Sequence, residues 1–251
     1  MKSFNTNSLP LIIFLGLSLS VKGQINKRQV TQQKLIWQTW NQSIEFNSKW
    51  SARFEFTARE FYDPYKLHQV AARMRISYAL SKQWVTGGGF AVFFHHPNDP
   101  VSTSKLVVPE WRPHVEASYE HTTGRCSITH RYRIENRFMH NNLNEALVDG
   151  YSSTWRFRYR IGFDYLIIND TAKRPLKLRL TNELLINAGK NVQNNVFDNN
   201  RVTLSIHYSL PANFAIEVGY LHWFQQRSSG YQFFNRHIIT FAIFHKLILN
   251  K

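Results

Sequence analysis

Apolar and polar side chains alternate with a period of two through most of this chain. Between residues 50 and 59 the even positions are Trp, Ala, Phe, Phe and Ala, whereas the odd positions are Ser, Arg, Glu, Thr and Arg. A period of two is that of a β-strand with two unlike faces, and no segment holds a convincing 3.6-residue period. The sequence therefore predicts an all-β fold. The same alternation returns at 126–137, 155–165, 176–186, 201–208 and 214–224.

Eleven strands are predicted, and most exceed the usual strand length of about 5–6 residues. Four of the predicted connections are tight turns, at 47–49, 81–82, 122–124 and 211–213. The connection at 169–175 is intermediate in length. The connections at 95–109, 140–151 and 189–199 are longer and polar. Short turns at one end and long loops at the other are typical of an outer-membrane barrel. The predicted strands are 34–46, 50–62, 66–80, 83–94, 110–121, 125–139, 152–166, 176–188, 200–210, 214–226 and 235–247.

The strand number has a parity problem, because a closed antiparallel barrel needs an even number of strands. Ten or twelve strands would satisfy it, and we expect twelve. The segment 24–33 would then supply a further strand or an internal N-terminal segment.

The first 23 residues have the layout of a secretory signal peptide. Lys2 gives a positive start, residues 9–19 are an apolar core, and Val21 and Gly23 stand at the −3 and −1 positions before Gln24. The apolar run is shorter than the roughly 20 residues that a transmembrane helix needs. We therefore expect an exported protein with a signal peptide at 1–23 and a single barrel domain at 24–251.

Three features favour a membrane barrel over a soluble one. The strands exceed the 9–11 residues that cross a bilayer at a tilt, and their predicted number exceeds the eight of lipocalin-type barrels. Aromatic residues also recur near strand ends, as in interfacial girdles. We expect a single antiparallel transmembrane β-barrel of the bacterial outer membrane, with short periplasmic turns and longer extracellular loops. A soluble secreted ligand-binding barrel is the alternative. The girdle candidates are Tyr62, Trp84, Trp111, Tyr119, Trp155, Tyr165, Trp223 and Phe224.

Charge is in excess, with 31 Lys and Arg against 16 Asp and Glu and a net charge of +15. Such an excess often indicates nucleic-acid binding, but the arginines here are spread over many strands and alternate with apolar residues. We therefore expect them in the barrel lumen, where buried charges must pair or stay hydrated. Arg59, Arg112, Arg236, Glu110 and Glu116 share this phase. The predicted lumen charge network is Arg53, Glu55, Arg73, Arg75, Arg131, Arg133, Glu135, Arg137, Arg156, Arg158, Arg160, Arg179, Glu183, Arg201 and Glu217.

Two functions are compatible with such a lumen. It can be filled by a structural ion-pair network, or it can pass small solutes, with a bias toward anions because cations outnumber acids. The motif Arg131-x-Arg133-x-Glu135-x-Arg137 beside 156–160 predicts cross-strand ladders.

Catalytic and metal sites are not expected. An outer-membrane lipid hydrolase is the enzyme alternative, yet the nearest His-x-Ser, His207 with Ser209, is predicted to face the lumen, where no acyl chain reaches. His95 and His96 form a loop pair that we expect to be solvated, and the three glycines at 87–89 are predicted to mark a bend or a close backbone approach. We predict that Cys126 is a small apolar residue that faces lipid. We expect neither enzymatic activity nor a cofactor.

Six short motifs carry a resemblance to a known family. They are Trp-Gln-Thr-Trp (37–40), Arg-Ile-Glu-Asn-Arg (133–137), Arg-Phe-Arg-Tyr-Arg (156–160), Thr-Asn-Glu (181–183), Phe-Asp-Asn-Asn-Arg (197–201) and Glu-Val-Gly-Tyr-Leu (217–221). In their order and spacing they resemble the domain-of-unknown-function 2490 family, exported bacterial proteins, mostly from Bacteroidota, that are taken to be outer-membrane β-barrels. The resemblance implies a fold and a location, and it implies no activity.

The same resemblance implies the partners of the chain: outer-membrane lipid and, during biogenesis, the barrel-assembly machinery. Outer-membrane strands commonly close on a terminal aromatic residue, and here Phe244 is followed by seven further residues. No nucleic acid is expected as a partner. The sequence does not define the oligomeric state.

Overall fold

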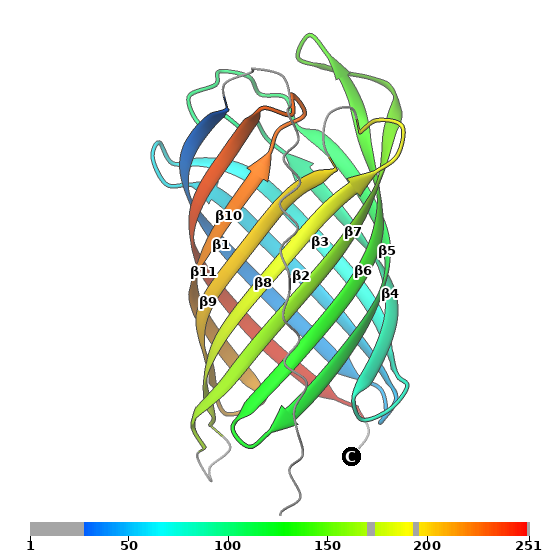
Figure 1. Cartoon of the computed structure of the whole chain (residues 1–251), viewed down its shortest axis with the longest axis vertical. Helices are drawn as coiled ribbons and strands as arrows, with labels where there is room; N and C mark the ends of the chain where they lie inside the picture. Colours follow the sequence, from blue (N-terminus) through cyan, green and yellow to red (C-terminus); the bar gives the residue numbers. More distant parts are fainter. Residues whose placement is uncertain (1–27, 170–173, 193–195, 250–251) are drawn as a thin grey trace, which may run out of the picture.

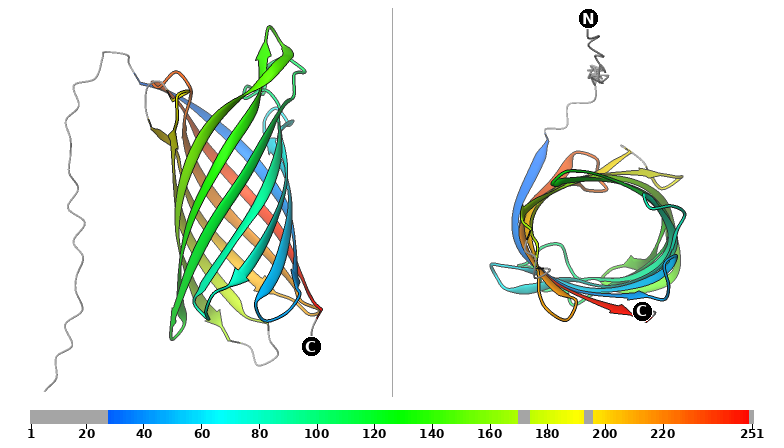
Figure 2. Two further views of the ribbon diagram at one scale, coloured as in Figure 1. Left: turned by 90° about the vertical axis from the view of Figure 1, so that its right-hand side faces the viewer. Right: turned by 90° about the horizontal axis from the view of Figure 1, so that it is seen from below.

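The chain forms one closed β-barrel of long, tilted strands (Figures 1 and 2). This computed structural model describes residues 28–169, 174–192 and 196–249. The predicted signal peptide, 1–23, lies outside the described residues. No helix in the described part of the chain is long and apolar enough to cross a membrane.

Eleven strands make up the described barrel, at nearly the positions that the alternation predicts. The ranges predicted for the eighth and tenth strands agree with the structure at both ends. The strands are β1 (Gln29–Glu45), β2 (Trp50–Phe61), β3 (Lys66–Ala79), β4 (Trp84–His95), β5 (Val108–Thr123), β6 (Cys126–Leu143), β7 (Ala146–Ile168), β8 (Leu176–Ala188), β9 (Phe197–Ser209), β10 (Phe214–Gln226) and β11 (Gln232–Ile248).

The barrel closes between its first and last strands, and this pair is parallel. Every other neighbouring pair is antiparallel and consecutive in sequence. The expectation of twelve antiparallel strands is therefore wrong for the described chain. With an odd number of strands the first and last run in the same direction, so they can pair only in parallel. Residues 29–33, which we expected in an additional segment, are the start of β1.

The two rims differ. We call the rim where β1 begins the upper rim and the rim where β11 ends the lower rim, as they lie in Figure 1. Lower connections are short, such as 80–83, whereas the upper rim carries the loop 96–107. The segment 140–151, predicted as a loop, is instead a hairpin that extends β6 and β7 above the barrel (Figure 1). Its two-residue turn, Asn144 and Glu145, has positive φ at both positions, as the tightest hairpin turns require.

The polar phase of the strands faces the interior and the apolar phase faces outward. Glu110, Glu135 and Arg156 are almost completely buried, whereas aromatic and aliphatic side chains of the opposite phase are exposed. This arrangement inverts the usual distribution in a soluble protein, where charged residues are rarely fully buried. The exposed outward set includes Trp40, Phe54, Phe56, Met74, Ile76, Tyr132, Ile134, Phe157, Leu204, Ile206, Ile216, Val218, Phe241 and Ile243.

Two buried apolar clusters break this rule; the smaller is Ala71, Ala91 and Phe93, and the larger lies inside the barrel. It joins β1, β2, β10 and β11 across the parallel seam. Trp223, which we expected near the interface, belongs to this interior cluster and is only 4% exposed. The upper interior is thus filled by apolar as well as charged groups. The cluster consists of Leu35, Trp37, Phe61, Leu221, Trp223 and Ile238.

Glycines at 87–89 let two strands approach closely, as the sequence predicts. A Cβ on Gly89 would overlap the backbone oxygen of Met74 and come within 2.9 Å of the His114 ring. A Cβ on neighbouring Gly88 would meet nothing closer than the backbone oxygen of His114 at 3.5 Å, an ordinary contact.

We predict that Gly89→Ala destabilises the barrel by about 1–3 kcal/mol, because overpacking against backbone forces the strands apart. Gly88→Ala is the matched control and should change stability by less than about 0.5 kcal/mol. Urea titration of the refolded variants, followed by the gel-mobility difference between folded and boiled protein, measures both. If the two variants had equal free energies of unfolding, the close packing around Gly89 would be contradicted.

Candidate functional site

The interior face carries far more arginines than acids. Nine of its fourteen arginines form ion pairs within the described strands, with eight carboxylates. The paired arginines are Arg73, Arg75, Arg112, Arg131, Arg133, Arg137, Arg156, Arg158 and Arg179. The carboxylates are Glu55, Glu110, Glu116, Glu135, Asp164, Glu183, Asp198 and Glu217.

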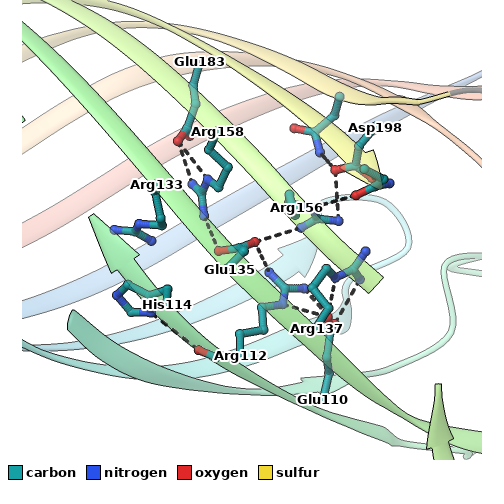
Figure 3. A network of polar contacts seen from close by, with 12 residues as sticks. Glu110, Arg112, His114, Arg133, Glu135, Arg137, Arg156, Arg158, Glu183 and Asp198 are labelled. Atoms are coloured by element: carbon teal, nitrogen blue, oxygen red, sulfur yellow. Dashed lines mark hydrogen bonds and ion pairs between the residues drawn. The ribbon is translucent and has the colours of Figure 1, made fainter. Parts of the chain in front are cut away.

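Glu135 lies at the centre of the network (Figure 3). Its Oε2 accepts a hydrogen bond from Arg158 Nη1 at 3.0 Å, and its Oε1 accepts one from Arg156 Nη1 at 3.3 Å. Arg112 approaches the same Oε1 from β5 at 3.9 Å. One carboxylate on β6 therefore joins cations from the strands on both sides of it.

A second acid, Glu110, closes the network toward the upper rim. Arg112 binds it with two hydrogen bonds of 2.8 and 2.7 Å, and Arg137 Nε and Nη2 bind the same carboxylate. His95 Nε2 donates to Glu110 Oε2 at 2.6 Å. The expectation that His95 is a solvated loop residue is wrong, because His95 ends β4 and its ring reaches the interior.

Like charges face one another on β6 and β7. The register pairs Arg131 with Arg160 and Arg133 with Arg158. Acids from the next strands separate these cations: Glu183 of β8 accepts hydrogen bonds from Arg158 at 2.8 Å and from Arg131 at 2.5 Å. Glu116 of β5 accepts one from Arg133 Nε at 2.7 Å and also pairs with Arg75.

Near the lower rim the charged groups are open to solvent. Arg179 bridges Asp164 at 3.0 Å and Glu217 at 2.8 Å, and these side chains are 18–28% exposed. Glu217 also accepts from His207 Nδ1 at 3.2 Å. His207 thus belongs to an ion-pair group inside the barrel, and among the described contacts no hydrogen bond joins it to Ser209.

The upper interior is closed instead. The side chains of Glu110, Glu135 and Arg156 are 0–3% exposed. Asn98, from the loop 96–107, reaches into the barrel: its Oδ1 accepts from Arg236 Nη2 and His68 Nε2, each at 3.1 Å, and its backbone oxygen accepts from Gln33 at 2.6 Å. The central charged groups of the upper interior are therefore less exposed to solvent than those of the lower lumen.

Comparison with known proteins adds a family to this geometry. A model of a family described as proteins of unknown function, DUF2490, matches residues 35–235, from β1 to the start of β11. This chain belongs to the DUF2490 family. No curated protein and no solved structure matches it.

The structure of this DUF2490 barrel places the fifteen residues of the predicted charge network on the interior face. Ion pairs join twelve of them, and Arg53, Arg160 and Arg201 form none with the residues that the structure describes. Sequence reasoning left Asp198 out, because a bulge beside the start of β9 turns it inward out of phase. It also missed Asn98, for which a long polar loop gives no signal of insertion.

Metal binding finds no support in this DUF2490 barrel. Among the described residues no group of three or more His, Cys, Asp or Glu side chains is placed to hold a metal ion. Cys126 is exposed and unpaired at the beginning of β6.

Replacing Glu135 with Gln should lower the stability of the DUF2490 barrel by about 3 kcal/mol, because it leaves buried guanidinium groups without their shared carboxylate. Glu120→Gln provides the control: Glu120 is exposed near the lower end of β5, and its loss should cost no more than about 0.5 kcal/mol. Urea unfolding of both variants in the same detergent measures the difference. If the two variants unfolded together, the network would not be stabilising the fold.

Proposed function

We propose that this protein is an outer-membrane β-barrel that is closed in the present state. The observation that carries the proposal is the inverted distribution of side chains, with buried charges inside and an exposed apolar surface outside. Monomeric soluble proteins rarely expose contiguous apolar patches larger than a few hundred Å². A hydrocarbon environment accepts such a surface without cost.

The height of the apolar surface supports the same proposal. On β4 the outward aromatic residues Trp84 and Phe94 are ten positions apart, and on β7 so are Trp155 and Tyr165; all four are exposed. At about 3.3 Å per residue and a tilt of about 40°, ten positions span about 25 Å. That is the height of the apolar band in outer-membrane barrels, whose edges carry aromatic girdles.

The orientation follows from the rims. Short turns lie at the lower rim, which we assign to the periplasm, and the longer loops and the β6–β7 hairpin lie at the upper rim, which we assign to the cell exterior. In this orientation the packed upper interior of the barrel separates the cell exterior from a lower lumen that is exposed to periplasmic water. With His207 and Ser209 on the interior face, the proposal gives the barrel no lipid-hydrolysing role.

Passage of small anionic solutes is the second candidate function. It is favoured by the excess of interior arginines, five of which lack a carboxylate partner among the described residues. An aqueous path would require the Asn98 contacts to open, because Asn98 links the loop to β1, β3 and β11.

Planar-bilayer recording separates the two functions. A closed structural barrel should give no steady conductance, whereas anion-biased steps would support passage. Detergent-refolded protein should also migrate faster on gels before boiling than after it. A monomer that stays soluble without detergent and leaves vesicles unbound would contradict the membrane proposal.

The outward face provides a mutational test. Ile134→Arg should cost roughly 2–4 kcal/mol in lipid vesicles, because the arginine would meet hydrocarbon near the middle of the apolar band. Leu143→Arg is the control, since Leu143 is exposed on the hairpin above the barrel and should tolerate the charge within about 1 kcal/mol. Equal unfolding free energies for the two variants would contradict burial of this face in lipid.

A further inference from the structure

Five interior arginines form no ion pair among the described residues, and they divide into two groups. Arg53 is exposed in the lower lumen, and Arg160 is half-buried in β7 opposite Glu183. The second group, Arg59, Arg201 and Arg236, lies nearer the parallel seam. Arg59 and Arg236 are 5% and 0% exposed, whereas Arg201 is half-buried opposite Glu183 in the register and forms no ion pair with it. Arg59 and Arg236 therefore lack both a carboxylate partner among the described residues and ready access to water.

These three arginines gather around two tryptophans of the interior cluster. The Arg59 guanidinium carbon lies 3.9 Å from the ring centre of Trp37, and that of Arg201 lies 4.6 Å from the ring centre of Trp223. Arg236 contacts the same Trp223 ring at 4.4 Å. The two indole rings meet edge to face at 5.5 Å. Cation–π contacts of this kind stabilise each arginine, and they do not neutralise its charge.

Four hydrogen-bond donors of this group have no acceptor in the described part of the chain. They are Nε1 of Trp37, Nε1 of Trp223, Nε of Arg59 and Nε of Arg201, and all four atoms are buried. A buried donor without an acceptor destabilises the fold, because its lost hydrogen bond to water is not replaced. Arg236 differs, because Gln33 and Gln225 accept from it, each at 2.7 Å.

We propose that the group formed by Trp37, Arg59, Arg201 and Trp223 is a binding site for a small anion. The donors come from β1, β2, β9 and β10, so the site lies across the interior beside the parallel seam. The indole and guanidinium N–H groups would bind a halide, or the carboxylate or phosphate group of a solute. The anion would supply the negative charge for those arginines that the eight interior acids do not pair with. Water could accept these hydrogen bonds, but it would leave the like charges unneutralised.

This proposal deepens the anion chemistry of the proposed function, and it rests on that function only for the route by which an anion arrives. Binding is measured on folded protein in detergent. A barrel that does not conduct, or that sits in no membrane, still gives a result for the site. If the barrel conducts but the test below fails, only the proposed anion site is overturned and the proposed function stands.

The experiment measures the melting temperature of detergent-refolded protein in increasing concentrations of sodium bromide, acetate or phosphate, and compares the three anions at equal ionic strength. A ligand that binds only the folded state raises stability with the logarithm of its concentration, so we expect about 3–5 °C for each tenfold rise above the dissociation constant. A response to bromide alone identifies a halide site. Responses to acetate or phosphate identify the carboxylate or phosphate of a solute.

Two variants test the assignment to these residues. Arg201→Gln should abolish the anion dependence and, at low anion concentration, melt above the wild type, because it removes an unneutralised like charge. Trp37→Phe keeps the ring beside Arg59 but removes one donor, and it should weaken binding at least fivefold. The fold of each variant is checked by heat-modifiable gel migration.

Arg160→Gln is the matched control. It also removes a half-buried arginine without an ion pair, but one that contacts neither Trp37 nor Trp223 among the described residues, and the anion dependence should remain that of the wild type. The proposal is overturned if the wild type shows no anion dependence, which would mean that only water fills the site. It is also overturned if Arg201→Gln and Trp37→Phe respond to anions as Arg160→Gln does.

Discussion

The scarcity of carboxylates inside the barrel determines how its interior is organised. With eight acids for fourteen arginines, half of the interior acids pair with more than one arginine: Glu135 binds Arg156 and Arg158, and Glu110 binds Arg112 and Arg137. Shared carboxylates draw β5 to β9 into one network and allow the upper lumen to exclude water. Buried ion pairs tolerate such closure only when each charge keeps its partner, so the arginines left over must lie in the wet lower lumen or find another counter-charge.

The local sequence pattern predicts most of the strands, but it does not predict how the barrel closes. Alternation of side chains places all eleven strands, because each strand needs only its own two faces to be recognised. The pairing of β1 with β11 depends on strand number rather than on any residue in either strand. The hairpin at 140–151 was missed for a related reason: it extends above the barrel and encloses no interior, so its alternation of apolar and polar side chains fades.

For the site, phase identifies which side chains point inward but not which of them meet. Glu183 of β8 reaches Arg131 of β6 across the intervening strand, and Glu116 of β5 reaches Arg75 of β3. Such contacts skip a strand, so cross-strand register alone does not predict them. Trp37 and Trp223 carried a weak signal, since each is a large aromatic residue on the polar phase of its strand. A large apolar side chain at an inward-facing position of a strand indicates where apolar groups fill the lumen.

The parallel seam has a consequence for how the barrel assembles. Ten of its eleven strand pairs join neighbours in sequence and can form one hairpin at a time, whereas β1 and β11 pair residues 203 positions apart. Contacts of such long range are the slowest to form, so we expect the seam to close last. Until it does, β1 and β11 are both free edges, and free edges are templates for pairing with other chains. The seam is therefore where the unfinished sheet is most exposed to pairing with other chains.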